Sequence, residues 1–98
     1  MYVKIIKSYR GVVAVCDSEL VGKKFEEGNF QLDVKDSFYK GEKLEEKRVI
    51  QVMQSMSKED STFNIVGEKS VNTALKAGII SEQGIKKIQG VPFALVLM

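Results

Sequence analysis

The start of the chain holds two short apolar runs separated by a turn. Residues 1–7 and Val12 to Cys16 are rich in valine and isoleucine, a composition typical of β-strands. Between them, Ser8-Tyr9-Arg10-Gly11 ends in a glycine that is free to adopt positive φ. Two strands joined so closely are expected to pair as a hairpin. The second run lacks polar alternation, which indicates a strand covered on both faces.

Two segments have the apolar spacing of amphipathic helices. Residues 44–57 predict the longer helix and residues 67–77 a second one, which Gly78 ends in the left-handed conformation. Methionine at this spacing is more typical of core filling than of a binding surface. The stripe of the first helix consists of Val49, Val52, Met53 and Met56.

The remaining apolar patterns complete an α+β chain. Alternation or short apolar runs predict further strands over residues 29–34, 62–66, 85–88 and 93–98, with an irregular stretch from residue 17 and a loop at residues 37–41. The expected order is β-β-β-α-β-α-β-β. It predicts a single domain over residues 1–98, with an antiparallel or mixed sheet of about five strands and two main helices on one face.

The composition is that of a folded, water-soluble protein. Hydrophobic residues make up 44% and charged residues 29% of the chain. No apolar run approaches the ~20 residues that a membrane-spanning helix needs. Without a leader sequence, the expected compartment is the cytoplasm. The net charge of +2 is too small to indicate nucleic-acid binding by itself, although residues 1–16 contain three basic residues and no acidic one.

The residue types exclude most covalent chemistry. The chain has no histidine and one cysteine, so it cannot form a Ser-His-Asp or Cys-His pair or an internal disulfide. Cys16 lies in an apolar run and is expected to be a small core residue. Structural zinc is excluded for a monomer, no cofactor is expected, and no nucleotide-binding glycine fingerprint is present. A carboxylate-based metal or acid–base site stays open as a minor alternative.

One candidate binding site lies at the predicted junction of a strand and a helix. Gly67 follows the strand that contains Asn64, and the free N–H groups of a helix start can bind an anion with help from Lys69. Glu68 competes with this interpretation, because it can satisfy those donors itself. The alternative is a tight connection without a ligand.

A second candidate is the segment Gly22-Lys23-Lys24-Phe25. Two lysines and an aromatic ring can contact a phosphate backbone and stack on a base. Two glutamates follow at once, however, and Phe25 is more simply explained as an anchor that holds the loop on the core.

Five segments spread over the chain together resemble a known family. They are Val13-Ala14-Val15-Cys16-Asp17, Leu20-Val21-Gly22-Lys23-Lys24-Phe25-Glu26-Glu27-Gly28, Phe38-Tyr39-Lys40-Gly41, Asn64-Ile65-Val66-Gly67-Glu68 and Gly90-Val91-Pro92. As an ordered set they resemble DUF424, a family of small archaeal proteins. The resemblance implies a compact α+β protein of the archaeal cytoplasm. It implies no activity and supplies no catalytic residue.

Three hypotheses of function remain. The first is a non-enzymatic binding module, for RNA or a ribonucleoprotein. The second is a metabolite- or anion-binding protein or small enzyme, which requires a pocket where Glu68, Lys69 and another polar side chain converge. The third is an adaptor or assembly subunit that pairs through a free strand edge at residues 30–34 or 93–98. The apolar run at residues 93–98 predicts either a central strand or an interface.

Overall fold

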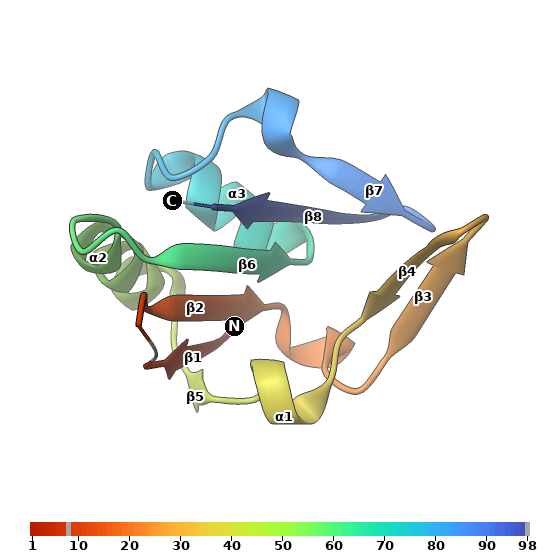
Figure 1. The fold of residues 1–98 in the computed structure, drawn as a ribbon, viewed down its shortest axis with the longest axis horizontal. Coiled ribbons are helices and arrows are strands. Elements are labelled where there is room, and N and C mark those ends of the chain that lie inside the picture. Colours follow the sequence, from red (N-terminus) through yellow and green to blue (C-terminus); the bar gives the residue numbers. More distant parts are fainter. Residues whose placement is uncertain (8, 98) are drawn as a thin grey trace.

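A mixed six-stranded β-sheet forms the centre of the molecule, in the order β5-β1-β2-β6-β8-β7 (Figure 1). The computed structural model describes residues 1–7 and 9–97. The strands of this sheet are β1 (Tyr2–Ile6), β2 (Val12–Cys16), β5 (Glu42–Lys43), β6 (Thr62–Val66), β7 (Lys86–Ile88) and β8 (Val91–Val96). Among them β2 and β6 pair in parallel, while the other neighbours pair antiparallel. The hairpin predicted at the start of the chain is confirmed, and β7 and β8 form another hairpin near its end.

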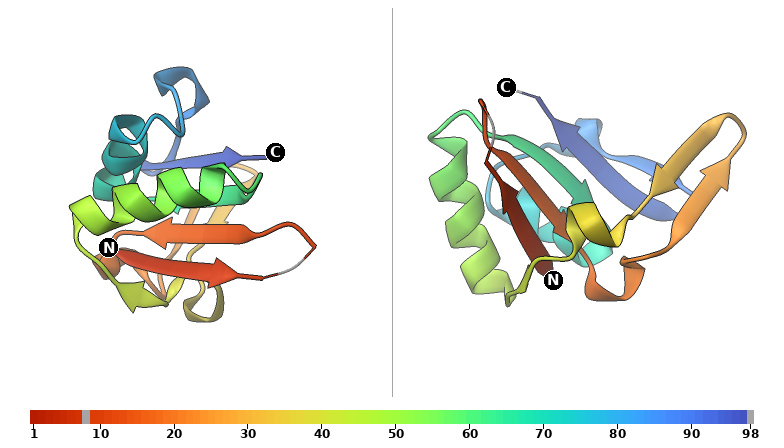
Figure 2. Two further views of the ribbon diagram at one scale, coloured as in Figure 1. Left: turned by 90° about the vertical axis from the view of Figure 1, so that its left-hand side faces the viewer. Right: turned by 60° about the horizontal axis from the view of Figure 1, so that its bottom comes forward.

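Two helices cover one face of the sheet. Helices α2 (Glu46–Ser57) and α3 (Glu68–Lys76) lie behind it in Figure 1, and Figure 2 shows both against the same face. Met53 is fully buried, which confirms that the α2 stripe serves the core. Gly78 has φ +76 and ends α3 as predicted. The buried cluster on this side, called here the helix-side core, contains Val3, Val13, Val15, Val49, Met53, Phe63, Ile65, Val71, Ala74 and Ala77.

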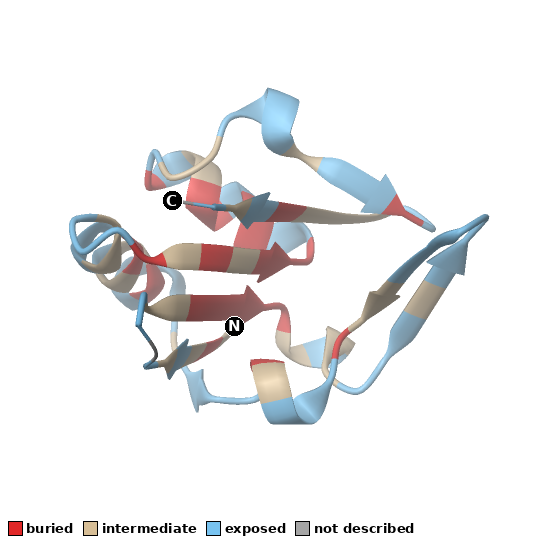
Figure 3. Ribbon diagram, viewed as in Figure 1, coloured by how far each residue is buried: buried red, intermediate tan, exposed pale blue. Residues whose placement is uncertain are grey.

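A hairpin and two short helical turns cover part of the other face. Strands β3 (Lys24–Glu27) and β4 (Phe30–Asp33) form a separate two-stranded sheet, called here the arm. The turns are η1 (Ser18–Leu20) and α1 (Asp36–Tyr39), and a further turn, η2 (Glu82–Gly84), precedes β7. A second cluster lies under the arm, called here the arm-side core: Ala14, Cys16, Val34, Tyr39 and Val66. In Figure 3 the buried positions lie mainly along the central strands, and the arm is mostly exposed.

The α+β class is confirmed, but several details of the prediction were wrong. Residues 24–27 form β3 rather than an irregular stretch, because a single half-buried phenylalanine among charged residues leaves too little alternation to detect. The predicted loop contains α1, whose Tyr39 is buried. The two-residue β5 is too short to leave a pattern, and β8 begins at Val91. None of the helices in the described ranges is long and apolar enough to span a membrane.

Candidate functional site

Three of the motif segments meet at the turn between β6 and α3. The backbone N–H of Asp17 donates to the carbonyl of Val66 at 3.1 Å, which extends the β2–β6 pairing by one residue. The N–H of Gly67 donates to the carbonyl of Pro92 at 2.8 Å. Segments far apart in the sequence are therefore tied together at one end of the sheet.

The carboxylate of Asp17 caps the N-terminus of α3. Its Oδ2 accepts the N–H of Lys69 at 3.1 Å, and its Oδ1 accepts the N–H and the hydroxyl of Ser70 at 2.8 and 2.7 Å. Asp17 is only 3% exposed. The expectation that Glu68 satisfies these donors was wrong, because a carboxylate from a distant loop takes them. An external anion at this turn would have to displace Asp17.

Position 67 requires a glycine for two reasons, its backbone conformation and the lack of space for a side chain. Its φ is +107, in the region that favours glycine. A Cβ atom there would overlap the carboxylate carbon of Asp17, since non-bonded atoms cannot approach so closely. The local geometry is that of a tight strand-to-helix connection built around a buried carboxylate.

The four residues predicted for this turn do not converge. Asn64 pairs with Leu95 across the sheet and is half-buried on the face that the helices leave free. Glu68 and Lys69 are both exposed but line different depressions. Lys69 borders one that also contains Glu46 of α2.

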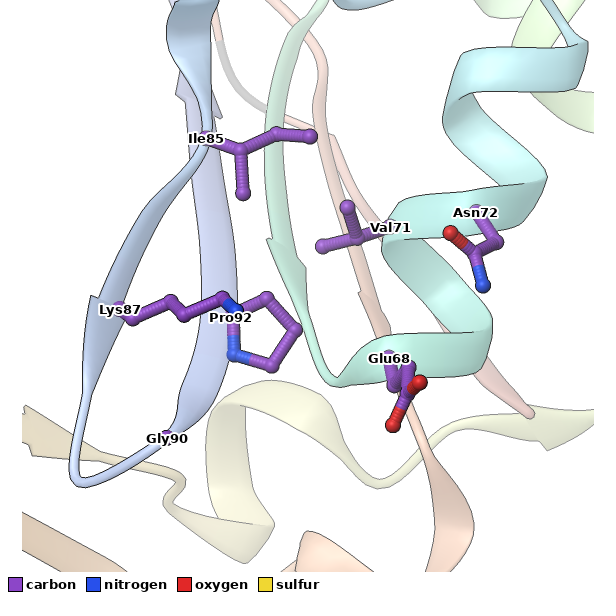
Figure 4. Close-up of a pocket in the computed structure, with 7 residues that line it drawn as sticks. All are labelled: Glu68, Val71, Asn72, Ile85, Lys87, Gly90 and Pro92. Atoms are coloured by element: carbon purple, nitrogen blue, oxygen red, sulfur yellow. The ribbon is translucent and has the colours of Figure 1, made fainter. Parts of the chain in front are cut away.

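Glu68 borders a pocket between α3 and the β7–β8 hairpin (Figure 4). The pocket has a volume of about 240 Å³. Val71 and Ile85 extend into the gap from opposite walls, and Pro92 lies beside Lys87, its partner in the β7–β8 pairing (Figure 4). The second hypothesis required Glu68, Lys69 and another polar side chain to converge in one pocket, and the pocket at Glu68 does not include Lys69. Its other polar side chains are Lys87 and Asn72 rather than Lys69. The full lining is Glu68, Val71, Asn72, Ile85, Lys87, Gly90 and Pro92.

The segment Gly22 to Phe25 is a loop anchored on the core. Gly22 has φ +87, and its N–H donates to the carbonyl of Val34 at 2.7 Å. Phe25 packs against the arm-side core, which confirms the anchor interpretation. Lys23 and Lys24 are exposed, and the ammonium of Lys24 lies 3.6 Å from the carboxylate of Glu26. With Phe25 packed inward, the loop presents no ring on which a base could stack.

A contact between the arm and the β7–β8 hairpin joins two of the motif segments. Glu27 Oε1 accepts the backbone N–H of Gln89 at 2.9 Å. Gln89 and Gly90 form the tip of that hairpin and have φ of 51 and 78, the signs expected for a tight two-residue turn. The arm is thus held at its far end by the hairpin.

The lone thiol is held in its neutral form. Cys16 is fully buried, which confirms the predicted core position. Burial, reinforced by the charge of Asp17, raises the pKa of Cys16 to about 12. The thiolate is the nucleophilic form of cysteine, so this side chain is poorly suited to nucleophilic chemistry at neutral pH. Within residues 1–7 and 9–97, no three side chains of the metal-ligating types His, Cys, Asp and Glu form a cluster.

The half of the second sheet face beyond the arm carries exposed leucines. Leu95 of β8 is 55% exposed, and Leu97, directly after β8, is 73% exposed. By the strand register, this face also carries the side chains of Lys4, Lys43 and Lys86, while no strand of the six-stranded sheet places an aspartate or glutamate on it. We call the region around Leu95 and Leu97 the open face. The ammonium of Lys4 donates to the carbonyl of Ser37 in α1 at 2.6 Å. Lys43 and Lys86 pair with Tyr2 and Phe93, which pack on the arm-side core.

The last residues of β8 also leave backbone groups unpaired. The bond from Gly67 to Pro92 shows that the even-numbered residues of β8 direct their N–H and C=O groups at β6, since the two sides alternate along an antiparallel strand. The groups of Leu95 therefore point to the side of β7. The pairing with β7 ends at Phe93, opposite Lys86. The C-terminal run is thus a central strand at its start and a free edge at its end.

Comparisons with known proteins place the chain in a family. Residues 7–98 match the model of a family described as "Protein of unknown function (DUF424)". A crystal structure of an uncharacterized conserved protein from Methanopyrus kandleri is similar, with a TM-score of 0.83 and 22% identity over 99% of this chain and 92% of that one. At this identity the likeness shows a shared fold. No curated protein matches. The family match covers nearly the whole sequence, and the chain therefore belongs to the DUF424 family.

Proposed function

We propose that this chain is a protein-binding module that pairs with an extended segment of a partner along the free edge of β8. The proposal rests on Leu95, which combines an exposed apolar side chain with backbone N–H and C=O groups that have no partner in the sheet. Strand addition uses these two features together: backbone hydrogen bonds give affinity and alternate side chains give specificity.

The edge lacks the usual protection against pairing. Natural proteins block exposed edges with charged residues, proline or bulges. Residues 94–97 read Ala-Leu-Val-Leu, without any of these. At the opposite end of the sheet, the start of β1 is covered by β5 at Tyr2 and Val3. An unprotected edge beside exposed leucines supports a role in binding.

The charge of the open face indicates the chemistry of the partner. The strands place three lysines and no acidic residue on this whole side of the sheet, so an apolar segment with acidic residues is complementary to it. A single-stranded nucleic acid is also anionic, but its recognition relies on exposed aromatic rings. The exposed side chains on β8 are leucines, and this favours a protein segment over RNA.

The proposal is tested with a defined probe, a capped peptide of alternating valine and glutamate. In an amide-resolved NMR titration, the largest shifts are expected at Leu95 and Leu97, together with slower hydrogen exchange of their N–H groups. Leu95→Gln should weaken binding about tenfold, because it removes the apolar contact without adding a charge. Phe30→Gln is the matched control: Phe30 is 72% exposed but lies on the arm, so its replacement should leave the affinity unchanged.

Two outcomes would overturn the proposal. One is peptide binding that Leu95→Gln and Phe30→Gln weaken equally. The other is the absence of peptide binding together with saturable binding of oligouridylate that Lys23→Ala and Lys24→Ala abolish, which would favour the RNA hypothesis and the Gly22–Phe25 loop. Self-association of the protein through β8, detected by sedimentation, would show that a second copy rather than a different partner occupies the edge.

A further inference from the structure

The pocket between α3 and the β7–β8 hairpin holds two opposite charges that do not meet. Glu68 and Lys87 line it from opposite walls (Figure 4). No ion pair within 4.0 Å joins them, and neither side chain has a hydrogen-bond or ion-pair partner among the residues that the structure describes. Other exposed charges of the chain do find partners, such as Lys76 with Glu46 at 2.7 Å.

The Glu68 carboxylate is free because another group has taken the role that it would ordinarily fill. A glutamate in the first turn of a helix commonly satisfies the exposed N–H groups. Here Asp17 binds the N–H groups of Lys69 and Ser70, which leaves the Glu68 carboxylate available.

The two walls are fixed by contacts outside the pocket. Asp17 holds the start of α3, and the N–H of Gly67 is bonded to Pro92 of the facing strand. The tight turn after Lys87 is bonded to Glu27 of the arm. Because both backbones are anchored, a ligand would not have to order them, and this reduces the entropic cost of binding.

The space between the charges is small and has both polar and apolar walls. The pocket holds about 240 Å³, below the range of about 300–1,000 Å³ usual for drug-sized ligands, and its inner wall is formed by Val71, Ile85 and Pro92. A complementary ligand carries a cationic group for Glu68, an anionic group for Lys87 and a short apolar skeleton between them. A dipeptide spans at most about 7 Å between its ends, which exceeds the contact distance of an ion pair and suits two charges that are not paired directly.

We infer that the pocket between α3 and the β7–β8 hairpin binds a small zwitterion, an apolar dipeptide, with its ammonium group on Glu68 and its carboxylate on Lys87. This site lies on the helix-covered side of the sheet. It is independent of the strand-pairing function proposed for β8, because Lys87 pairs with Pro92 and Lys86 with Phe93, so the two lysines project from opposite faces.

The test uses glycyl-leucine as the probe, with binding followed by amide-resolved NMR and calorimetry. Saturable shifts are expected at Glu68, Asn72 and Lys87. Glu68→Gln and Lys87→Gln should each weaken binding about fivefold or more, as expected for loss of one charge-assisted contact at a partly exposed site. Lys86→Gln is the matched control: it removes the neighbouring charge on the same strand from the other face, and it should change the affinity less than twofold.

Capped ligands separate recognition of the two charges. N-acetyl-glycyl-leucine lacks the cation and should bind wild-type protein more weakly, but it should be insensitive to Glu68→Gln. Glycyl-leucinamide lacks the anion and should be insensitive to Lys87→Gln. The inference is wrong if both capped forms bind as tightly as glycyl-leucine. It is also wrong if Lys86→Gln and Lys87→Gln have equal effects, or if no saturable shift appears at these residues up to about 10 mM ligand.

Discussion

The two faces of the central sheet are covered by different kinds of structure. On one face α2 and α3 lie across the strands, and the core beneath them includes fully buried Phe63 and Met53. On the other face the arm, η1 and α1 cover only part of the surface (Figures 1 and 2), and Leu95 stays more than half exposed. The helices cover one face of the sheet, while the arm leaves half of the other face available for contacts.

The difference follows from how stable each covering element is by itself. An amphipathic helix forms its own backbone bonds and buries a continuous apolar stripe. A two-stranded hairpin is at best marginally stable alone. Most of the β3 side chains are exposed, so the arm depends on Phe25 packing beneath it and on the hydrogen bond that the N–H of Gln89 donates to Glu27. We therefore expect the arm-covered side to tolerate local opening more readily than the helix-covered side.

The largest contrast is expected between two phenylalanines. Phe63→Ala empties a fully buried position in the helix-side core and should lower the free energy of unfolding by about 4 kcal/mol. Phe25→Ala removes a half-buried side chain and should cost about 1.5 kcal/mol. Urea unfolding monitored by circular dichroism measures both values.

Hydrogen exchange distinguishes the effects of the two phenylalanine variants further. In Phe25→Ala the faster exchange should be confined to the amides of β3 and β4, because the helix-side core is intact. In Phe63→Ala it should extend over the whole sheet. Equal losses of stability, or global exchange in both variants, would show that the two faces do not differ in this way.

The next largest effect is expected at the turn that joins the two sides. Gly67→Ala introduces both an unfavourable φ and an overlap with Asp17, and it should cost about 3 kcal/mol or more. Gly78→Ala is the matched control, since its φ is +76 but an added Cβ would meet nothing within 4 Å. It should cost about 1 kcal/mol, the conformational part alone. Similar costs at both positions would mean that Asp17 moves away freely.

The elements whose apolar residues repeat at a regular spacing were predictable from the sequence. The α2 stripe and the valine-rich run of β2 follow helical and buried-strand patterns, because their side chains pack on a continuous surface. The arm escaped detection because its apolar side chains contact the sheet at few positions. In β3 only Phe25 carries a signal, and its neighbours are charged and exposed.

The candidate site was predictable in its location but not in its contacts. Gly67 at the end of a β-rich run correctly indicated a strand-to-helix turn. The partner of that turn is Asp17, which lies 53 residues from Ser70 along the chain, and local spacing cannot reveal such a contact. The same holds for Glu68 and Lys87, which line one pocket only because β7 and β8 pair beside α3.

A pH effect of intermediate size is expected from the arm-covered side. Burial raises the pKa of Cys16 from 9.0 to about 12, and burial, followed by the influence of Cys16, raises that of Tyr39 from 10.0 to about 12. Both groups are neutral in the folded state and ionise more easily when unfolded. Their contribution to stability is therefore present below about pH 9 and is lost as the pH rises toward 12.

Urea unfolding between neutral pH and pH 11 tests this prediction. Wild-type stability should fall above about pH 9. Cys16→Ala and Tyr39→Phe should each reduce the steepness of that fall, whatever their effect at neutral pH. An unchanged pH dependence in both variants would place the responsible groups elsewhere.

The smallest effect is expected where the second face is open. Leu97 is 73% exposed and lies beyond the last residue of β8, so it contributes little packing to the folded monomer. Leu97→Gln should change the free energy of unfolding by less than about 0.5 kcal/mol, as for most surface substitutions. Leu95→Gln should cost somewhat more, because part of its side chain is covered. If Leu97→Gln instead destabilises the protein by several kcal/mol at high concentration but not on dilution, the leucine is buried between copies of the chain. The open face would then be an interface of the protein with itself rather than a surface for a different partner.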